Sequence, residues 1–271
     1  MKPNENDIVS NWNELLEVIE KYFSGDRKKN ILALHTHFED TMSIAPASTK
    51  DHFHNAFPGG YVMHVLNIIK CALLLRDTWK TAGCNVNFTD EELVFSAMFH
   101  DLGKVGDRDM EYYIPQDDQW RRTKLNELYT INPKLDFMNV SDRTMLLLMH
   151  FSITCSNKEF LAIKLADGLY NEANKQYYIS YGPDTALKTN LPFIIHAADF
   201  MAMTSERDAW KAETLKEESS SVGVPTSVAK KEKQYTRKQT VGEVVKTGLK
   251  VTDFSQMFED VFGTDVKKGE K

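Results

Sequence analysis

Apolar residues recur along most of this chain at the spacing of one helix face. The first stripe ends at Ser24-Gly25-Asp26 and consists of Ile8, Trp12, Leu15, Leu16, Ile19, Tyr22 and Phe23. Similar patterns predict further helices over residues 28–42, 59–81, 89–103, 141–150, 158–174 and 191–214. Because nearly every patterned segment has the helical period, the sequence predicts an all-α fold built as a helical bundle.

Three intervals interrupt the helical pattern. Residues 43–58 contain two prolines and are predicted to form a loop, and residues 177–190 are rich in turn-forming residues, which suggests a connection with a short hairpin. Residues 105–139 are polar, aromatic and irregular. This long excursion directly follows a His-Asp pair, so we expect it to form a wall of a functional site.

The composition of the chain changes after its last predicted domain helix. Residues 1–215 are interpreted as one helical domain, and residues 216–240, rich in serine and lysine, as a linker. A flexible C-terminal tail, residues 241–271, carries a short amphipathic helix built from Phe254, Met257, Phe258, Val261 and Phe262. Two interpretations stay open: this helix packs back on the domain, or it inserts into a groove of a protein partner.

Length, composition, net charge and cysteine count limit the partners and the cellular compartment that we expect. With 271 residues, 42% of them hydrophobic, the chain can bury a core, and a net charge of −6 argues against broad nucleic-acid binding. Three widely spaced cysteines do not form a disulfide framework. The start lacks an apolar signal segment and no apolar run reaches membrane-spanning length, so we expect a cytoplasmic protein without a membrane partner. Helical periodicity is equally compatible with a monomer and a homodimer.

A histidine and an aspartate, His100 and Asp101, stand side by side at the end of an apolar helix pattern. Burying such a pair is costly unless a partner such as a divalent cation compensates it. His64 lies in another apolar helix, and Asp199 lies in a third, three residues after His196 and on the same side of the helix. The alternative for a single histidine or aspartate is a hydrogen-bonded core residue. Taken together, the nitrogen and oxygen donors suit Mn, Fe, Co, Ni or Zn.

Three motifs carry a resemblance to a known family. They are Ala45-Pro46-Ala47 followed by His54-Asn55-Ala56-Phe57-Pro58-Gly59-Gly60-Tyr61-Val62-Met63-His64, then His100-Asp101-Leu102-Gly103-Lys104, and His196-Ala197-Ala198-Asp199. Over residues 38–207 the chain resembles the HD-domain superfamily of metal-dependent phosphohydrolases, in particular the HD module of bacterial 3′–5′ exoribonucleases, which carry a second histidine where Asn55 stands. The resemblance implies an HD-domain-like helical bundle in which the metal ligands are His64, His100, Asp101 and Asp199.

This chain lacks some residues of the family pattern, and these differences limit which family properties we expect of it. Some HD enzymes bind a second metal through further histidines, and His150 is a candidate for one of them. Many relatives carry a histidine before an Asp-Gly like Asp167-Gly168, where this chain has Ala166. We therefore expect one divalent transition metal. No segment resembles the oligonucleotide-binding β-domain of the exoribonucleases, so a nucleic-acid substrate is not favoured.

The expected activity is hydrolysis of a phosphate ester, with a mono-, tri- or cyclic nucleotide as the substrate class. Asp101 would orient the attacking water, Lys104 would neutralise phosphoryl charge, and either His150 or His196 would contact phosphate or protonate the leaving oxygen. Further candidates for substrate binding are Arg108, Arg121, Arg122, Lys124 and Tyr170. Two alternatives stay open: a di-iron HD-type oxygenase, and a non-enzymatic adaptor with a structural metal and a partner-binding helix over 254–262.

Overall fold

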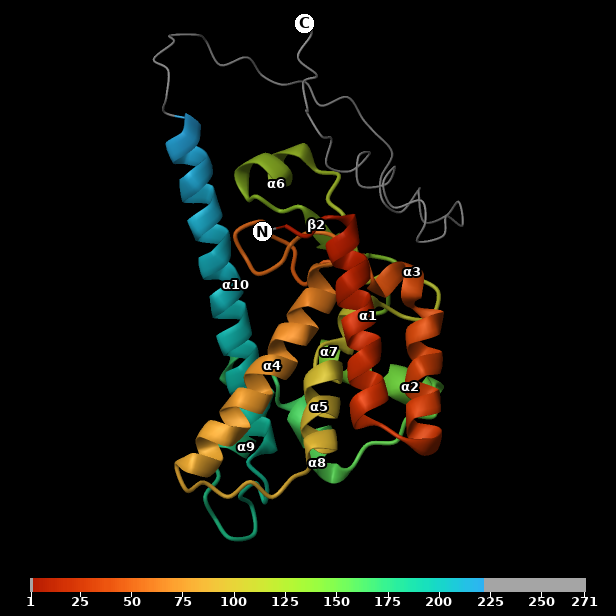
Figure 1. Ribbon diagram of the computed structural model, residues 1–271, viewed down its shortest axis with the longest axis vertical. Coiled ribbons are helices and arrows are strands. Elements are labelled where there is room, and N and C mark those ends of the chain that lie inside the picture. The colour runs from red at the N-terminus through yellow and green to blue at the C-terminus, as the bar shows by residue number, and fades with distance from the viewer. Residues whose placement is uncertain (1, 222–271) are drawn as a thin grey trace, which may run out of the picture.

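The protein is all-α: helices take up 61% and strands 5% of the described part of the chain. The computed structural model describes the backbone of residues 2–221 and the side chains of residues 2–215 (Figure 1). The α-helices are α1 (Glu5–Tyr22), α2 (Gly25–His37), α3 (Glu39–Met42), α4 (Gly60–Thr81), α5 (Asp90–Phe99), α6 (Gln119–Lys124), α7 (Val140–His150), α8 (Asn157–Lys164), α9 (Lys175–Tyr178) and α10 (Leu191–Ser221). Short 3₁₀ helices are η1 (Leu102–Val105), η2 (Gly168–Tyr170) and η3 (Glu172–Asn174).

The helix starts follow from local chemistry. Helix α5 begins after Thr89, whose side chain accepts a hydrogen bond from the Glu92 amide while the Glu92 side chain accepts one from the Thr89 amide. This capping box satisfies amide donors that the first turn leaves unpaired. Helix α4 begins after Gly59, which has φ = 79°, a conformation that glycine adopts without steric cost.

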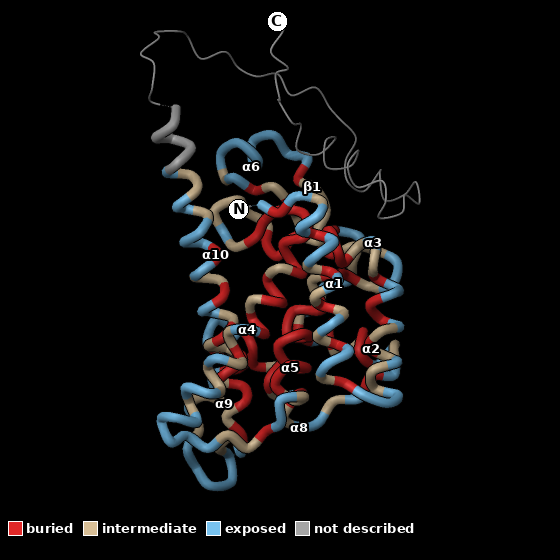
Figure 2. Tube along the Cα trace, viewed as in Figure 1, coloured by how far each residue is buried: buried red, intermediate tan, exposed pale blue. Residues whose placement is uncertain are grey.

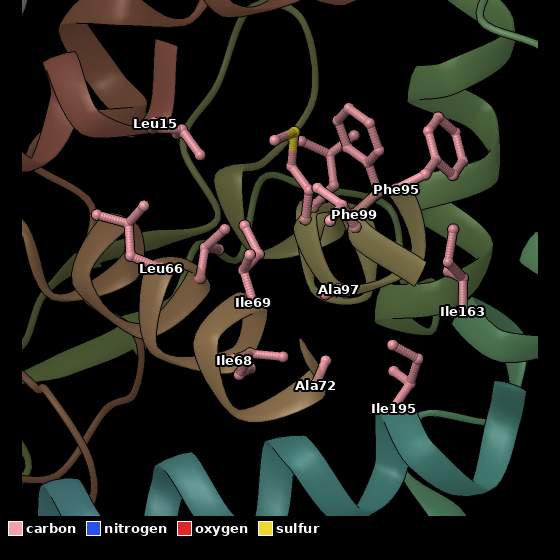
Figure 3. Packing of buried hydrophobic residues seen from close by; sticks show 14 of the residues in the cluster. Leu15, Leu66, Ile68, Ile69, Ala72, Phe95, Ala97, Phe99, Ile163 and Ile195 are labelled. Carbon is pink, nitrogen blue, oxygen red and sulfur yellow. The ribbon is translucent and has the colours of Figure 1, made fainter. Parts of the chain in front are cut away.

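Helix α5 forms the centre of the core, because all seven residues from Leu93 to Phe99 are buried. Figure 3 shows Phe95 and Phe99 of α5 near side chains from α4, α8 and α10, among them Ile163 and Ile195. Helix α10 runs along one side of the molecule against α4 (Figure 1). Buried segments concentrate on α4, α5 and the inner faces around them, whereas α6 is exposed (Figure 2). The packed core therefore holds α4, α5 and α10, and with them their polar residues, in fixed positions.

Several boundaries differ from the sequence prediction. The helix predicted over 28–42 is divided at Phe38, which is buried and breaks the helical backbone between α2 and α3. The helix predicted over 158–174 ends at Lys164 and gives way to η2 and η3. The final helix extends to Ser221, beyond the predicted end near residue 214 and into the predicted linker.

The hairpin prediction was wrong in its position. Within residues 2–221 the paired strands are β1 (Tyr113–Pro115) and β2 (Tyr129–Ile131), antiparallel with Tyr113 opposite Ile131. They lie inside the excursion after the His-Asp pair, with α6 between them, and residues 177–190 contain no strand. Period-2 patterns over three residues are too short to read from sequence, so this sheet left no clear signal.

Two further predictions concern residues that the structure does not describe. The linker over 222–240 and the amphipathic helix with Phe254 to Phe262 lie outside the described residues. Among the helices that are described, none combines the length and the apolar character required to cross a membrane.

Candidate metal centre

Three elements bring their polar residues together in the interior. His64 lies in the second turn of α4, His100 is the residue that caps the end of α5, and Asp101 precedes η1. One donor atom from each lies within 4.8 Å of the other two, and all three residues are buried. Asp199 of α10 approaches the same group, with Oδ1 3.3 Å from His64 Nε2. The group formed by His64, His100 and Asp101 can hold a metal ion.

The end of α5 allows two neighbouring residues to face one site. Successive residues on an α-helix point about 100° apart. The chain leaves α5 at His100 and enters η1 at Asp101, and His100 Nε2 then lies 3.3 Å from Asp101 Oδ2. Gly103 makes this turn feasible, because a Cβ there would lie 2.2 Å from the carbonyl oxygen of Val140 in α7. Its amide also donates a hydrogen bond to Thr144 Oγ1 at 2.9 Å.

Hydrogen bonds fix which nitrogen of each histidine is available to a metal. His64 Nδ1 donates to the Glu206 carboxylate at 2.9 Å, and His100 Nδ1 donates to the Ala97 carbonyl at 2.8 Å. Because both partners are acceptors, each neutral ring carries its proton on Nδ1 and its lone pair on Nε2. Both Nε2 atoms are buried and lack a hydrogen-bond partner among the described residues. Two such nitrogens next to carboxylate oxygens fit a divalent cation.

Glu206 was missed by sequence reasoning. This buried carboxylate of α10 accepts from His64 Nδ1 and from Asn67 Nδ2, the latter at 2.8 Å. It lies seven residues after Asp199, so both acids project from one face of α10 two turns apart. That spacing is a signal that the sequence did offer. A carboxylate behind a ligand histidine orients the ring and increases its basicity.

The electrostatics of the centre favour its charged forms. Burial alone would lower the pKa of His64, but the Glu206 and Asp199 carboxylates outweigh it and raise that pKa to about 10. Burial opposes ionisation of Asp101 as well, yet Lys104 and His100 hold the pKa of its carboxyl well below the usual range. A metal must displace the proton from His64, so we expect metal uptake to release protons.

Lys104, the residue expected to neutralise phosphoryl charge, pairs with Asp101 of the donor group. Its Nζ is 2.5 Å from Asp101 Oδ2. Burial would lower the pKa of Lys104, but the Asp101 carboxylate overrides this and raises it. Lys104 therefore carries a fixed positive charge beside the donor group.

His196 precedes Asp199 by three residues in the sequence, but its side chain contacts residues outside the donor group. Its Nδ1 donates to the Ala166 carbonyl at 2.8 Å, and its ring packs so closely on Gly168 that a Cβ there would lie 2.3 Å from ring atoms. Tyr170 is exposed, with its ring 6.5 Å from that of His196. His196 and Tyr170 thus form a half-exposed cluster outside the three-residue donor group.

The predicted phosphate clamps lie apart from the donor group or have other partners. Arg121 makes a two-pronged ion pair with the buried Glu127, at 2.9 Å for the shorter contact. Arg122 and Lys124 are exposed on α6, and His150 is exposed at the end of α7. The backbone carbonyl of Arg108 accepts a hydrogen bond from His37 at 3.1 Å.

A second missed residue is His54, in the loop before α4. Its ring centroid lies 4.7 Å from that of His64, and its Nε2 is buried with no hydrogen-bond partner among the described residues. Burial, reinforced by the neighbouring His64 and Lys104, lowers the pKa of His54 to about 3, so this ring is neutral. A histidine in an aperiodic loop gives no pattern from which its direction could have been predicted.

The comparisons with known proteins give no family. The chain matches no protein-family model, no curated protein and no solved structure.

Proposed function

We propose that the protein is an HD-type metal-dependent phosphohydrolase that acts on a phosphate ester of the nucleotide class. One observation carries the proposal: His64 and His100 each use Nδ1 for a hydrogen bond and each keep a buried Nε2 that makes no hydrogen bond but lies 3.3 Å from a carboxylate oxygen, of Asp199 and of Asp101 respectively. In a core that served stability alone, each of these acceptor nitrogens would be expected to have a hydrogen-bond donor. The order of the motifs, His, His-Asp and Asp, supports the same family.

In this proposal His64, His100, Asp101 and Asp199 hold one divalent transition metal. The ion would supply Lewis-acid chemistry, polarising a phosphate ester and lowering the pKa of water. Asp101 orients the nucleophilic water, and Lys104 neutralises charge on the phosphoryl group from its fixed position beside Asp101. His196, whose ring lies 6.5 Å from that of the exposed Tyr170, is the candidate for leaving-group protonation, and Tyr170 is the candidate for contact with a base or sugar.

The metal content of purified variants tests the ligand assignment. We expect wild-type protein to bind one equivalent of Mn, Co or Ni after removal of metal by a chelator, and the His100→Ala and Asp101→Asn variants to bind none stoichiometrically. His52→Ala is a matched control, because His52 lies on the loop before α4 and makes an edge contact with Phe53. Retention of full metal by both ligand variants would contradict the assignment.

Phosphate release tests the activity itself. We expect the metal-loaded wild-type protein to release phosphate or cleave a phosphodiester in a panel of mono-, tri- and cyclic nucleotides, and the His100→Ala variant to lose this activity. A metal-loaded protein that turns over no phosphate ester but shows a di-iron absorption band would instead support the oxygenase alternative. Full metal without any turnover would favour a structural metal and the adaptor alternative.

A further inference from the structure

The loop before α4 is built so that His54 reaches the metal centre. The Ser48 hydroxyl donates to the His54 carbonyl at 2.6 Å, and the Ala47 amide donates to the Asn55 carbonyl at 3.1 Å. Asn55 has φ = 46°, in the left-handed region, which asparagine adopts more readily than most other non-glycine residues and which turns the chain sharply after His54. A Cβ at Gly60 would lie 2.1 Å from the Asn55 carbonyl oxygen, so the loop also depends on this glycine.

The side chain delivered by this loop has an unused nitrogen. His54 Nε2 is buried and lacks a hydrogen-bond partner among the described residues, although its ring lies against His64. Burial of an unpaired nitrogen destabilises a fold. A loop that its own hydrogen bonds hold in place, with such a nitrogen beside a candidate metal centre, indicates a group that acts when a ligand is present.

His54 does not belong to the donor group itself. The three residues whose donor atoms lie within 4.8 Å of one another are His64, His100 and Asp101, and Asp199 joins them through Oδ1, 3.3 Å from His64 Nε2, whereas His54 contacts His64 through its ring. A ring that lies beside the group but outside it is placed to contact what the ion binds. It can do so by donating a hydrogen bond from Nε2, because a neutral imidazole carries one N–H.

The charges of the centre indicate the chemistry of that ligand. A divalent ion and Lys104 would together balance the carboxylates of Asp101, Asp199 and Glu206. A phosphate dianion then needs further hydrogen-bond donors to replace its water. His54 supplies one without adding charge, in the manner of a preorganised donor aimed at an oxyanion.

We propose that His54 is a substrate-binding residue whose Nε2–H donates to a phosphoryl oxygen of the ligand held at the metal centre. This proposal rests on the proposed metal-dependent function and names a residue for its substrate. It separates two roles among neighbouring histidines: His64 and His100 bind the ion, and His54 binds the anion.

The test uses the full chain loaded with Mn²⁺, with inorganic phosphate as the probe. Phosphate binding is measured by the relaxation of its ³¹P signal, which a nearby Mn²⁺ enhances, and Mn²⁺ binding is measured separately by titration. We expect His54→Ala to bind Mn²⁺ as the wild type does but phosphate about tenfold more weakly, the loss typical of one hydrogen bond to a charged group. His54→Gln, which retains an N–H donor, is expected to recover part of the affinity, and His52→Ala to change neither.

The outcomes separate this proposal from the proposed function. Loss of Mn²⁺ by His54→Ala would make His54 a metal ligand and overturn the proposal, as would unchanged phosphate affinity in that variant. Wild-type protein that binds Mn²⁺ but no phosphate near it also overturns the proposal while leaving the metal centre intact. Wild-type protein that binds no metal overturns the proposed function and this proposal together.

Discussion

Two clusters of buried charged groups in this fold differ in how they are paired. In the first, Arg27 of α2 bonds Glu159 of α8 at 2.6 Å and Glu91 of α5 at 2.8 Å, and its guanidinium lies over the Phe95 ring. In the second, the candidate metal centre, the carboxylates of Asp101, Asp199 and Glu206 accompany a single lysine, and Nε2 of two histidines makes no hydrogen bond. In the first cluster the guanidinium of Arg27 bonds both carboxylates. In the second cluster the histidine nitrogens need a proton or a metal ion as a partner.

The comparison teaches that burial of charge alone does not indicate a site. Both clusters join helices distant in sequence, and both contain a buried carboxylate, Glu159 in one and Asp101 in the other. The difference is the kind of group that lacks a hydrogen-bond partner: in the first cluster it is Arg27 Nε, a donor, and in the second it is Nε2 of two histidines, a metal-binding atom. A buried carboxylate that is bonded by a guanidinium serves structure, whereas histidine lone pairs that converge beside carboxylates indicate a place for a cation.

The largest effect is expected when the first cluster is broken. Arg27→Met leaves the buried Glu159 carboxylate without its cation, so we expect the free energy of unfolding to fall by about 3–5 kcal/mol. Urea unfolding measures this loss. The variant should still bind one equivalent of metal at low denaturant, because its cluster lies apart from the donor group.

A matched control for this variant is Lys164→Met. Lys164 and Asp142 form an equally short ion pair of 2.6 Å, but the carboxylate of Asp142 is 46% exposed, whereas that of Glu159 is 1% exposed. We expect a loss below about 1 kcal/mol, because water and salt screen exposed pairs. Similar losses in Lys164→Met and Arg27→Met would contradict the distinction between the two environments.

The sequence predicted the framework better than it predicted the site. The stripe from Ile8 to Ile19 and the Thr89 capping box specify α1 and α5, because helix faces and helix starts are encoded in adjacent residues. His64, His100 and Asp101 were selected because a motif order marks them. What surrounds them depends on packing between helices, which local sequence does not encode.

Particular residues show where this limit lies. The guanidinium of Arg121 is bound by Glu127 across a hairpin whose position the sequence did not reveal, so its availability as a phosphate clamp could not be judged from charge alone. Glu206 could have been noticed from its spacing to Asp199. His54 could not, because only the folded loop, with Asn55 in a left-handed conformation, directs it against His64.

A smaller effect is expected from His35, a buried histidine without a carboxylate partner. Burial lowers the pKa of His35 to about 4, although its bond to the Ile31 carbonyl opposes the shift, whereas two carboxylates raise that of His64 to about 10. Below pH 6.5 the unfolded chain therefore binds a proton at His35 that the folded protein rejects. Stability associated with this group is lost as the pH falls from about 6.5 towards 4.

The His35→Phe variant isolates that contribution. Between pH 7.5 and pH 5 we expect the wild type to lose about 2 kcal/mol more unfolding free energy than the variant, since each pKa unit corresponds to about 1.4 kcal/mol. Denaturant unfolding at the two pH values measures the difference. Equal pH dependence in the two proteins would contradict the prediction, because it would mean that folding does not lower the pKa of His35.

An effect of about the same size is expected for Glu206, the buried acid that bonds His64 in the second cluster. In Glu206→Gln the amide oxygen can still accept from His64 Nδ1, but the negative charge behind the ring is removed. We expect metal affinity to fall by about 10–100-fold, the range for groups that orient a ligand histidine. Competition with a chelator measures the affinity, and Asp208→Asn, an exposed acid on the same helix, should leave it unchanged.

A visible spectrum distinguishes positioning from mere stability in Glu206 variants. Co²⁺ bound to the centre absorbs according to the orientation and basicity of its ligands, so Glu206→Gln should shift the spectrum and Glu206→Ala should shift it further while both remain folded. An unaltered spectrum with weaker binding would mean that Glu206 supports only the helix packing. The proposed link, in which a buried acid acts on the ion through His64, requires the affinity and the spectrum to change together.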